Sequence, residues 1–195
     1  MTIDPNNLLN SILSSLDRID YIKSEELPNI DLYMDQLTTF METHLKSTKR
    51  YDSDKVLTKT MINNYAKNNL LPPPVKKKYS KEHSLLLIFI YYFKGVLSIH
   101  DIQTLFEPIT KKYFHKKDAF NLQSIYDQVF CLEGEQIHLL KEDVQEKFKL
   151  AKTTFQNAPK EDQEFLTLFS FICILSFDVY TKKLLIEKII DGMYT

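Results

Sequence analysis

Glycine is scarce in this chain of 195 residues, and tryptophan is absent. The three glycines are Gly95, Gly134 and Gly192. Because a fold with many hairpins needs glycine at its turns, this scarcity favours helices joined by short polar connections. The 11 tyrosines and 13 phenylalanines supply most of the bulky side chains for a core. Hydrophobic residues make up 44% of the chain and charged residues 26%, so the sequence predicts an ordinary globular protein rather than a disordered one.

Residues that would support catalysis or metal binding are also few. Cys131 and Cys173 lie too far apart to form a Cys-x-x-Cys motif, and we expect them to be reduced, buried thiols. The five histidines form no His-Glu-x-x-His pair, and the chain has no glycine-rich phosphate loop and no Gly-x-Ser-x-Gly motif. We therefore expect no enzymatic activity, no cofactor and no metal site.

No apolar run reaches the roughly 20 residues that a membrane span requires. The two most apolar runs cover residues 85–93 and 165–177, and we expect both to be buried core helices. The second run favours the core of a helical bundle with some interface, and a homodimer interface or a ligand pocket remain alternatives. The N-terminus lacks a basic segment followed by an apolar one, so the expectation is a cytoplasmic protein without a signal peptide or membrane contact.

Charge is strongly segregated, although the formal net charge is only −1. Residues 1–45 carry a net charge of −6, residues 46–82 carry +7 and residues 83–195 carry −2. A single concentrated basic segment suggests a local anionic partner, and a solvated basic loop is the alternative.

Helical spacing of apolar residues extends over most of the chain, which predicts a mainly α fold. Thr58, Ser80 and Ser98 are suitable helix caps, and the prolines at 72–74 end the helix that Thr58 begins. A short two-stranded wing is expected around residues 71–79. Helices are expected at residues 7–22, 31–46, 59–70, 81–93, 99–107, within 118–155 with a break near Gly134, and 160–194.

Residues 58–106 contain the most informative pattern. A short helix is followed by a basic segment stiffened by proline, a capped apolar helix, a glycine stop and another capped helix. The residues concerned are Leu70-Leu71-Pro72, Lys77-Lys78-Tyr79-Ser80, Ile90 to Gly95, Leu97-Ser98-Ile99, Asp101 and Ile102. This pattern resembles the MerR class of transcriptional regulators, which implies a winged helix-turn-helix. Where that class usually has Arg-Tyr-Tyr-Glu in its recognition helix, this chain has Asn63-Asn64-Tyr65-Ala66.

A second resemblance covers residues 27–106. The segment Ile30 to Phe40, the run Leu57 to Tyr65 and the run Lys77 to Ser80 are similar to a bacterial domain family of unknown function. This likeness is closer than that to MerR, but it implies no activity. The two resemblances imply a MerR-like winged helix-turn-helix domain at 27–110. Helical spacing on either side of it predicts an N-terminal amphipathic helix at 1–26 and a C-terminal helical region at 117–195.

The physical chemistry of the same segment is compatible with double-stranded DNA. A helix N-terminus presents free N–H groups to phosphate, asparagine can read adenine, and lysines can follow a phosphate backbone. The candidate DNA-binding residues are Thr58, Lys59, Thr60, Asn63, Asn64, Lys67, Lys76, Lys77, Lys78 and Tyr79. Core packing is the alternative for Tyr65 and Tyr79, helix-surface polarity for the asparagines, and a solvated loop for the lysines. Lys49 and Arg50 are further candidates for phosphate contact.

The sequence therefore predicts a sequence-specific transcriptional regulator with its recognition helix at 59–70 and a basic wing at 72–79. We expect a homodimer, and a helix around 129–155 is a candidate seam, with intramolecular packing as the alternative. That seam would use Ile137, Leu140, Val144, Phe148 and Phe155. The competing hypothesis is a non-enzymatic helical protein-interaction module that does not bind DNA. A sensor of an unidentified small-molecule effector is a third alternative.

Overall fold

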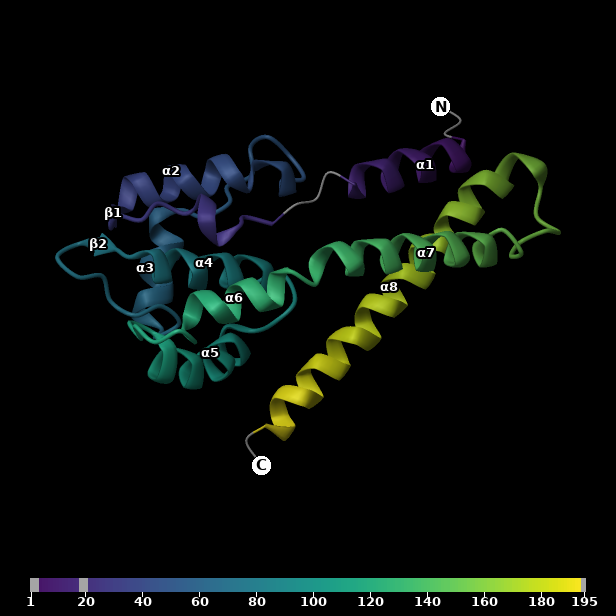
Figure 1. The fold of residues 1–195 in the computed structure, drawn as a ribbon. Coiled ribbons are helices and arrows are strands. Elements are labelled where there is room, and N and C mark those ends of the chain that lie inside the picture. Colours follow the sequence, from purple (N-terminus) through teal and green to yellow (C-terminus); the bar gives the residue numbers. More distant parts are fainter. Residues whose placement is uncertain (1–3, 18–20, 194–195) are drawn as a thin grey trace. The chain divides into compact units, whose positions relative to one another are not determined.

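The computed structural model describes residues 4–17 and 21–193 (Figure 1). Helices account for 68% of the chain and strands for 3%, so the predicted mainly α fold is confirmed. In chain order the elements are α1 (Pro5–Leu16), the 3₁₀ turn η1 (Ser24–Glu26), β1 (Leu32–Tyr33), α2 (Met34–His44), the 3₁₀ turn η2 (Lys46–Thr48), α3 (Lys59–Lys67), β2 (Lys78–Tyr79), α4 (Lys81–Phe93), α5 (Ile99–Tyr113), α6 (Leu122–Phe130), α7 (Glu133–Ala151) and α8 (Lys160–Gly192).

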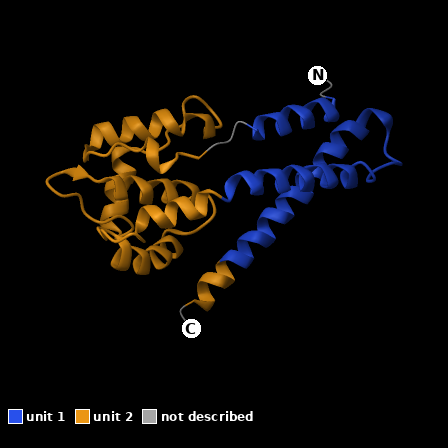
Figure 2. Ribbon diagram, viewed as in Figure 1, with its two compact units in different colours: residues 1–20, 132–186 blue, residues 21–131, 187–195 orange. Residues whose placement is uncertain are grey.

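The chain divides into two compact units (Figure 2). Unit 1 comprises residues 1–20 and 132–186, and unit 2 comprises residues 21–131 and 187–195. In this division α6 belongs to unit 2, and α1 groups with α7 and most of α8. Residues 18–20 of the helix predicted at 7–22 and residue 194 of the helix predicted at 160–194 lie outside the described residues.

The core of unit 2 is built around α4. Every residue from His83 to Ile90 is buried, so this helix is covered on all sides along that stretch, as expected for an apolar run. Phe89 contacts the rings of Phe106 in α5 and of Tyr126 in α6 at centroid distances of 6.2 and 5.4 Å. The buried Tyr126 hydroxyl donates a hydrogen bond to the Ile22 carbonyl oxygen at 2.5 Å. These contacts join Ile22, α5 and α6 to the core around α4.

The ends of the helices in unit 2 follow local chemistry with one exception. Ser80 and Ser98 are the N-caps of α4 and α5, as predicted. The prediction that α5 ends before Pro108 is wrong, since the helix continues through that proline to Tyr113. Phe106 is buried and Ile109 packs against the same core, so tertiary packing outweighs the cost of an interior proline.

The only sheet in the described part of the chain has two short strands. In the antiparallel pair, Leu32 of β1 lies opposite Tyr79 of β2, and Tyr33 lies opposite Lys78. The predicted wing at residues 71–79 is therefore corrected, because β2 pairs mainly with a strand that precedes α2. Within 71–79 itself, one isolated bridge joins Val75 to Lys78.

In unit 1, α1 and α7 share a small core with the first half of α8. Its buried members are Leu9, Val144, Phe148, Ala151 and Phe171. The dimer seam predicted along residues 129–155 is thus partly wrong, because Val144 and Phe148 pack within the chain. Leu140 and Phe155 from the same predicted seam are exposed.

Helix α8 is not the buried bundle core that its composition predicts. Only 6% of its most apolar window is buried, and the mean hydropathy of that window is 1.5. By length and composition alone, α8 is the one helix among the described residues that could cross a membrane. Cys131 and Cys173 are free, as expected, but the expectation that they are buried is wrong, since both are exposed.

Candidate nucleic-acid interface

Helix α3 is fixed at both ends by its own sequence. The Thr58 hydroxyl oxygen accepts a hydrogen bond from the Met61 N–H at 3.1 Å, so it satisfies one of the free donors of the first turn. At the other end Asn69 has φ 57°, and the Leu70 N–H donates to the Tyr65 carbonyl oxygen at 2.9 Å. This left-handed residue, followed by the buried Leu70, forms a Schellman motif. The helix therefore stops three residues before the predicted end at 70.

Helix α3 has a buried face and an exposed face. Ile62 and Tyr65 point into the core of unit 2, and burial raises the pKa of the Tyr65 hydroxyl. The opposite face is exposed and consists of Lys59, Thr60, Asn63, Asn64 and Lys67. Thr58 is only half-exposed, and its hydroxyl oxygen already serves as the cap. The exposed face thus presents two lysines, two primary amides and one hydroxyl on a single helix of nine residues.

A tight turn follows the three prolines. The Val75 N–H donates to the Lys78 carbonyl oxygen at 3.1 Å, and the Lys78 N–H donates to the Val75 carbonyl oxygen at 2.9 Å. Between them Lys76 and Lys77 have φ 51° and 64°. Positive φ at both central residues is the signature of a type I′ hairpin turn, which ordinarily uses Asn-Gly. Two lysines in left-handed backbone therefore strain this turn by about 1–2 kcal/mol per residue.

Both central lysines are exposed at the tip of the turn. Among the residues that the structure describes, no carboxylate lies within ion-pair distance of Lys76 or Lys77. The third lysine, Lys78, is half-buried, and its Nζ lies over the Tyr33 ring at 5.2 Å from the centroid. The turn therefore presents two uncompensated positive charges and one that is held against an aromatic ring.

Tyr79 does not belong to the exposed surface with which it was predicted. Its side chain is 3% exposed, and burial raises the pKa of its hydroxyl. The ring contacts the buried ring of His83 edge-on at 5.5 Å. Of the two alternatives left open by the sequence, core packing is the one that the structure supports.

The start of α2 brings the turn and α3 to neighbouring positions. Tyr33, directly before α2, lies beneath Lys78, and Asp35 in the first turn of α2 forms an ion pair with Lys59. Two residues of one helix start therefore touch both the lysine turn and the N-terminus of α3. An open hollow of about 340 Å³ lies between α2 and that N-terminus, lined in part by Thr58 and Lys59.

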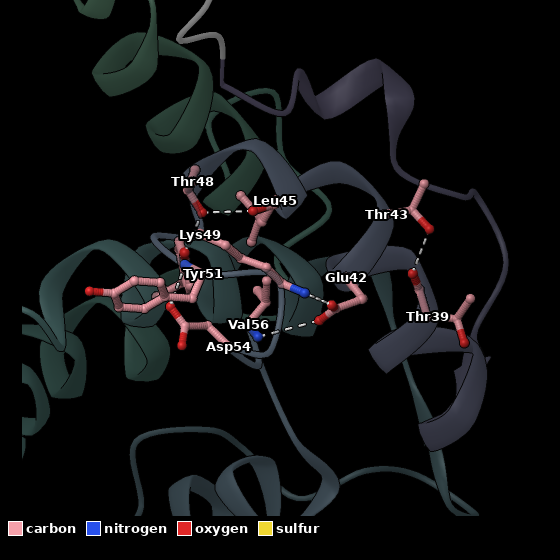
Figure 3. A network of polar contacts seen from close by, with 10 residues as sticks. Thr39, Glu42, Thr43, Leu45, Thr48, Lys49, Tyr51, Asp54 and Val56 are labelled. Carbon is pink, nitrogen blue, oxygen red and sulfur yellow. Dashed lines mark hydrogen bonds and ion pairs between the residues drawn. The ribbon is translucent and has the colours of Figure 1, made fainter. Parts of the chain in front are cut away.

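The long segment between α2 and α3 is held by Glu42 (Figure 3). Its carboxylate accepts hydrogen bonds from Lys49 and from the Val56 N–H, the latter at 3.3 Å. The hydrogen bond from Lys49 lowers the pKa of Glu42, and the side chain of Lys49 is only 9% exposed. Lys49 is therefore a structural residue rather than the phosphate contact that the sequence suggested, whereas Arg50 stays exposed.

A sequence profile of one protein family matches residues 22–129, described as a domain of unknown function, DUF1836. The chain belongs to this family. The matched region covers more than half of the chain and coincides closely with residues 21–131 of unit 2. Comparisons with curated proteins and with solved structures gave no significant match.

The DUF1836 match confirms the predicted membership of a family of unknown function and does not extend to the MerR class. All ten candidate DNA-binding residues lie inside the DUF1836 region. Asp35 and Glu42 lie there as well, although no motif in the sequence marks them. Only the excess of acid in residues 1–45 hinted at their presence.

His83 is buried in the first turn of α4 and takes part in the capping box with Ser80. Its Nδ1 accepts a hydrogen bond from the Ser80 N–H at 3.0 Å, which requires the neutral ring to carry its proton on Nε2. Burial lowers the pKa of His83 to about 4. Within the described residues, no group of three His, Cys, Asp or Glu side chains could hold a metal ion. The described part of the DUF1836 domain thus offers a polar and basic surface on α3 and the lysine turn.

Proposed function

We propose that this DUF1836 protein binds double-stranded DNA in a sequence-specific manner and regulates transcription. Helix α3 would enter the major groove, and the Lys76–Lys77 turn would lie on flanking phosphates. In this proposal α2, α3, the lysine turn and α4 act as a winged helix-turn-helix of the MerR type. Two copies would read related half-sites as a homodimer.

The observation that carries the proposal is the pair of strained, exposed lysines. Asn-Gly would relieve the backbone of this turn, whereas Lys76 and Lys77 retain the strain together with two unpaired positive charges. Strained backbone persists where the residue serves a purpose that a relaxed alternative would not serve. A positive charge at the tip of a rigid turn is suited to a phosphate backbone.

In this proposal, side chains on the exposed face of α3 contact the base edges. An asparagine side chain can make a bidentate pair with adenine, and Asn63 and Asn64 project from the middle of that face. Lys59 and Thr60 lie in the first turn, where free N–H groups and the helix dipole favour phosphate. The ion pair of Lys59 with Asp35 would open on binding, as charge-assisted contacts to phosphate replace it.

A second candidate is a helical protein-interaction module that does not use DNA. The exposed apolar surface of α8 favours it, and Asp35 weakens the positive field at the start of α3. This candidate requires the α3 face to be irrelevant to nucleic acid.

Selection from a pool of random duplexes at about 150 mM salt separates the two candidates, since this salt screens non-specific attraction. Wild-type protein is expected to enrich a two-fold-related motif. Asn63→Ala and Asn64→Ala are expected to lose about 1–3 kcal/mol of discrimination at an adenine within that motif. Asn157→Ala, an exposed asparagine outside the DUF1836 domain, is the matched control and should enrich the wild-type motif. If no motif is enriched, the DNA-binding proposal fails and the interaction module takes its place.

A further inference from the structure

Helix α8 exposes a large apolar surface. Phe165 and Phe177 are each 69% exposed, and Phe169 and Tyr180 are more than half exposed. Because one aromatic side chain carries about 150–250 Å², these four rings alone leave about 500 Å² of apolar area uncovered. The largest apolar patch of a typical monomer is about 300–600 Å² in total.

The exposed residues follow a repeat rather than scatter at random. Phe165, Ile172, Val179 and Ile186 stand at intervals of seven residues, and all four are exposed. A seven-residue apolar repeat lets one helix follow another in a shallow left-handed supercoil. The spacing therefore matches a second helix of similar length better than it matches a flat surface.

The helices of its own unit cannot cover this stripe. At 1.5 Å per residue, α8 is about 50 Å long and α7 about 28 Å long. α1 and α7 contact a different side of α8, where Phe171 is buried and Ile174 and Leu175 are partly buried. The stripe of Phe165, Ile172, Val179 and Ile186 is thus left without a partner in unit 1.

We propose that this stripe is the interface with a second copy of the chain, formed by α8 against α8. An interface between identical patches must be self-complementary, and a stripe with only apolar residues at its repeat positions meets that condition. The exposed side chains on and beside the repeat leave roughly 600 Å² uncovered in each copy; they are Phe165, Phe169, Ile172, Val179, Tyr180 and Ile186. Specific interfaces bury about 1,200–2,000 Å² in total, so two such stripes reach the lower end of that range.

A lipid bilayer is a poorer occupant. The longest uncharged stretch of α8, Phe165 to Phe177, spans about 20 Å, whereas the hydrocarbon core is about 30 Å thick. The next residue, Asp178, is bound by Lys147 and Lys182 at 2.8 and 2.9 Å, and these two lysines together with the Lys147 partner Asp143 form a charged cluster beside the stripe. Insertion would have to remove this cluster from water.

This interface rests on the proposed function, since it would join the two copies of the proposed regulator. Its test uses no DNA, so the dimer proposal and the DNA-binding proposal can fail separately. Sedimentation velocity of the full chain is expected to give about twice the 23.0 kDa of one copy. The double variant Ile172→Glu/Val179→Glu should sediment as a monomer with unchanged helical circular dichroism. Leu150→Glu, which changes an exposed apolar residue of α7 outside the stripe, is the matched control and should remain a dimer.

Two further measurements keep the result decisive. In a Cys131→Ser/Cys173→Ser background, oxidation of the single variants Ile172→Cys and Val179→Cys should give cross-linked dimers in at least one case, and Leu150→Cys should give none. The wild-type chain should not co-float with vesicles of phosphatidylcholine and phosphatidylglycerol. A monomeric wild type, a dimer that survives both glutamates, or a chain that floats with the vesicles would each overturn the proposal.

Discussion

The strained turn at Val75–Lys78 allows stability and DNA binding to be changed in opposite directions. Replacing Lys76→Asn and Lys77→Gly supplies the residue pair that a type I′ turn prefers. Left-handed backbone costs about 1–2 kcal/mol for a residue such as lysine, and glycine returns part of that gain through its greater freedom in the unfolded chain. We therefore expect the free energy of unfolding of the variant to rise by about 1–2 kcal/mol.

The same variant removes both exposed charges from the turn. If each lysine neutralises one phosphate, the slope of log K against log salt should become less steep by about 1.8. Fluorescence anisotropy with the selected duplex at several salt concentrations measures that slope, and urea denaturation measures the stability. Lys111→Ala/Lys112→Ala, which removes two charges from the exposed end of α5, is the control and should leave the slope unchanged.

The free energy of unfolding tests the geometry of the turn, and the salt slope tests whether its lysines contact phosphate. A variant that is more stable but binds DNA with the wild-type slope would show that the lysines do not contact phosphate. A variant that is less stable would refute the type I′ geometry at Lys76 and Lys77, whatever happens to binding.

Three further outcomes are expected. Burial lowers the pKa of His83 from 6.5 to about 4, so the unfolded chain takes up this proton at a higher pH than the folded chain does. The free energy of unfolding should therefore decrease by roughly 3 kcal/mol as the pH is lowered from 6.5 to 4. In denaturation at several pH values, His83→Gln should flatten this dependence, whereas His100→Gln, at an exposed histidine, should not. Asp35→Asn releases Lys59 from its surface ion pair, so DNA affinity should rise by about 0.2–1 kcal/mol in anisotropy titrations, and an unchanged affinity would remove Lys59 from the interface. Asn69→Gly should raise the urea midpoint by an amount equivalent to about 0.5–1 kcal/mol, and a lower midpoint would contradict the left-handed cap.

The elements that the sequence predicted best are those whose signals are local. Thr58, Ser80 and Ser98 cap the helices that they were expected to cap. Helix α3 begins at the predicted residue, Lys59. Each of these features depends on residues within about one helical turn, so no knowledge of the tertiary structure was needed.

The errors come from contacts between distant residues. β1 has only two residues and exists because Leu32 and Tyr33 pair with β2 across more than forty positions. α1 belongs with α7 because Leu9 reaches a core that also contains Phe148. α8 was expected in a core because its composition is apolar, but composition does not say what covers a helix.

The basic segment at 46–82 shows how a net charge can mislead about a surface. Lys49 is folded onto Glu42 and Lys59 is paired with Asp35, both acids from the preceding segment, which has the opposite charge. These two acids compensate Lys49 and Lys59, whereas Lys76 and Lys77 in the turn have no ion pair with any other described residue. The net charge of +7 over residues 46–82 therefore overstates the positive charge around α3. It also gives no sign that Lys76 and Lys77 carry unpaired charges.

The two proposed surfaces lie in different parts of the chain. The candidate DNA surface lies entirely within the DUF1836 region at 22–129, whereas the stripe on α8 lies beyond it. Asn63→Ala should therefore leave the sedimentation of the chain unchanged, and Ile172→Glu/Val179→Glu should leave contact with one half-site intact. Ile172→Glu/Val179→Glu should lose the added affinity for two half-sites on one duplex, because each copy would then bind on its own. A simultaneous loss of both properties in either variant would mean that the two surfaces are not independent.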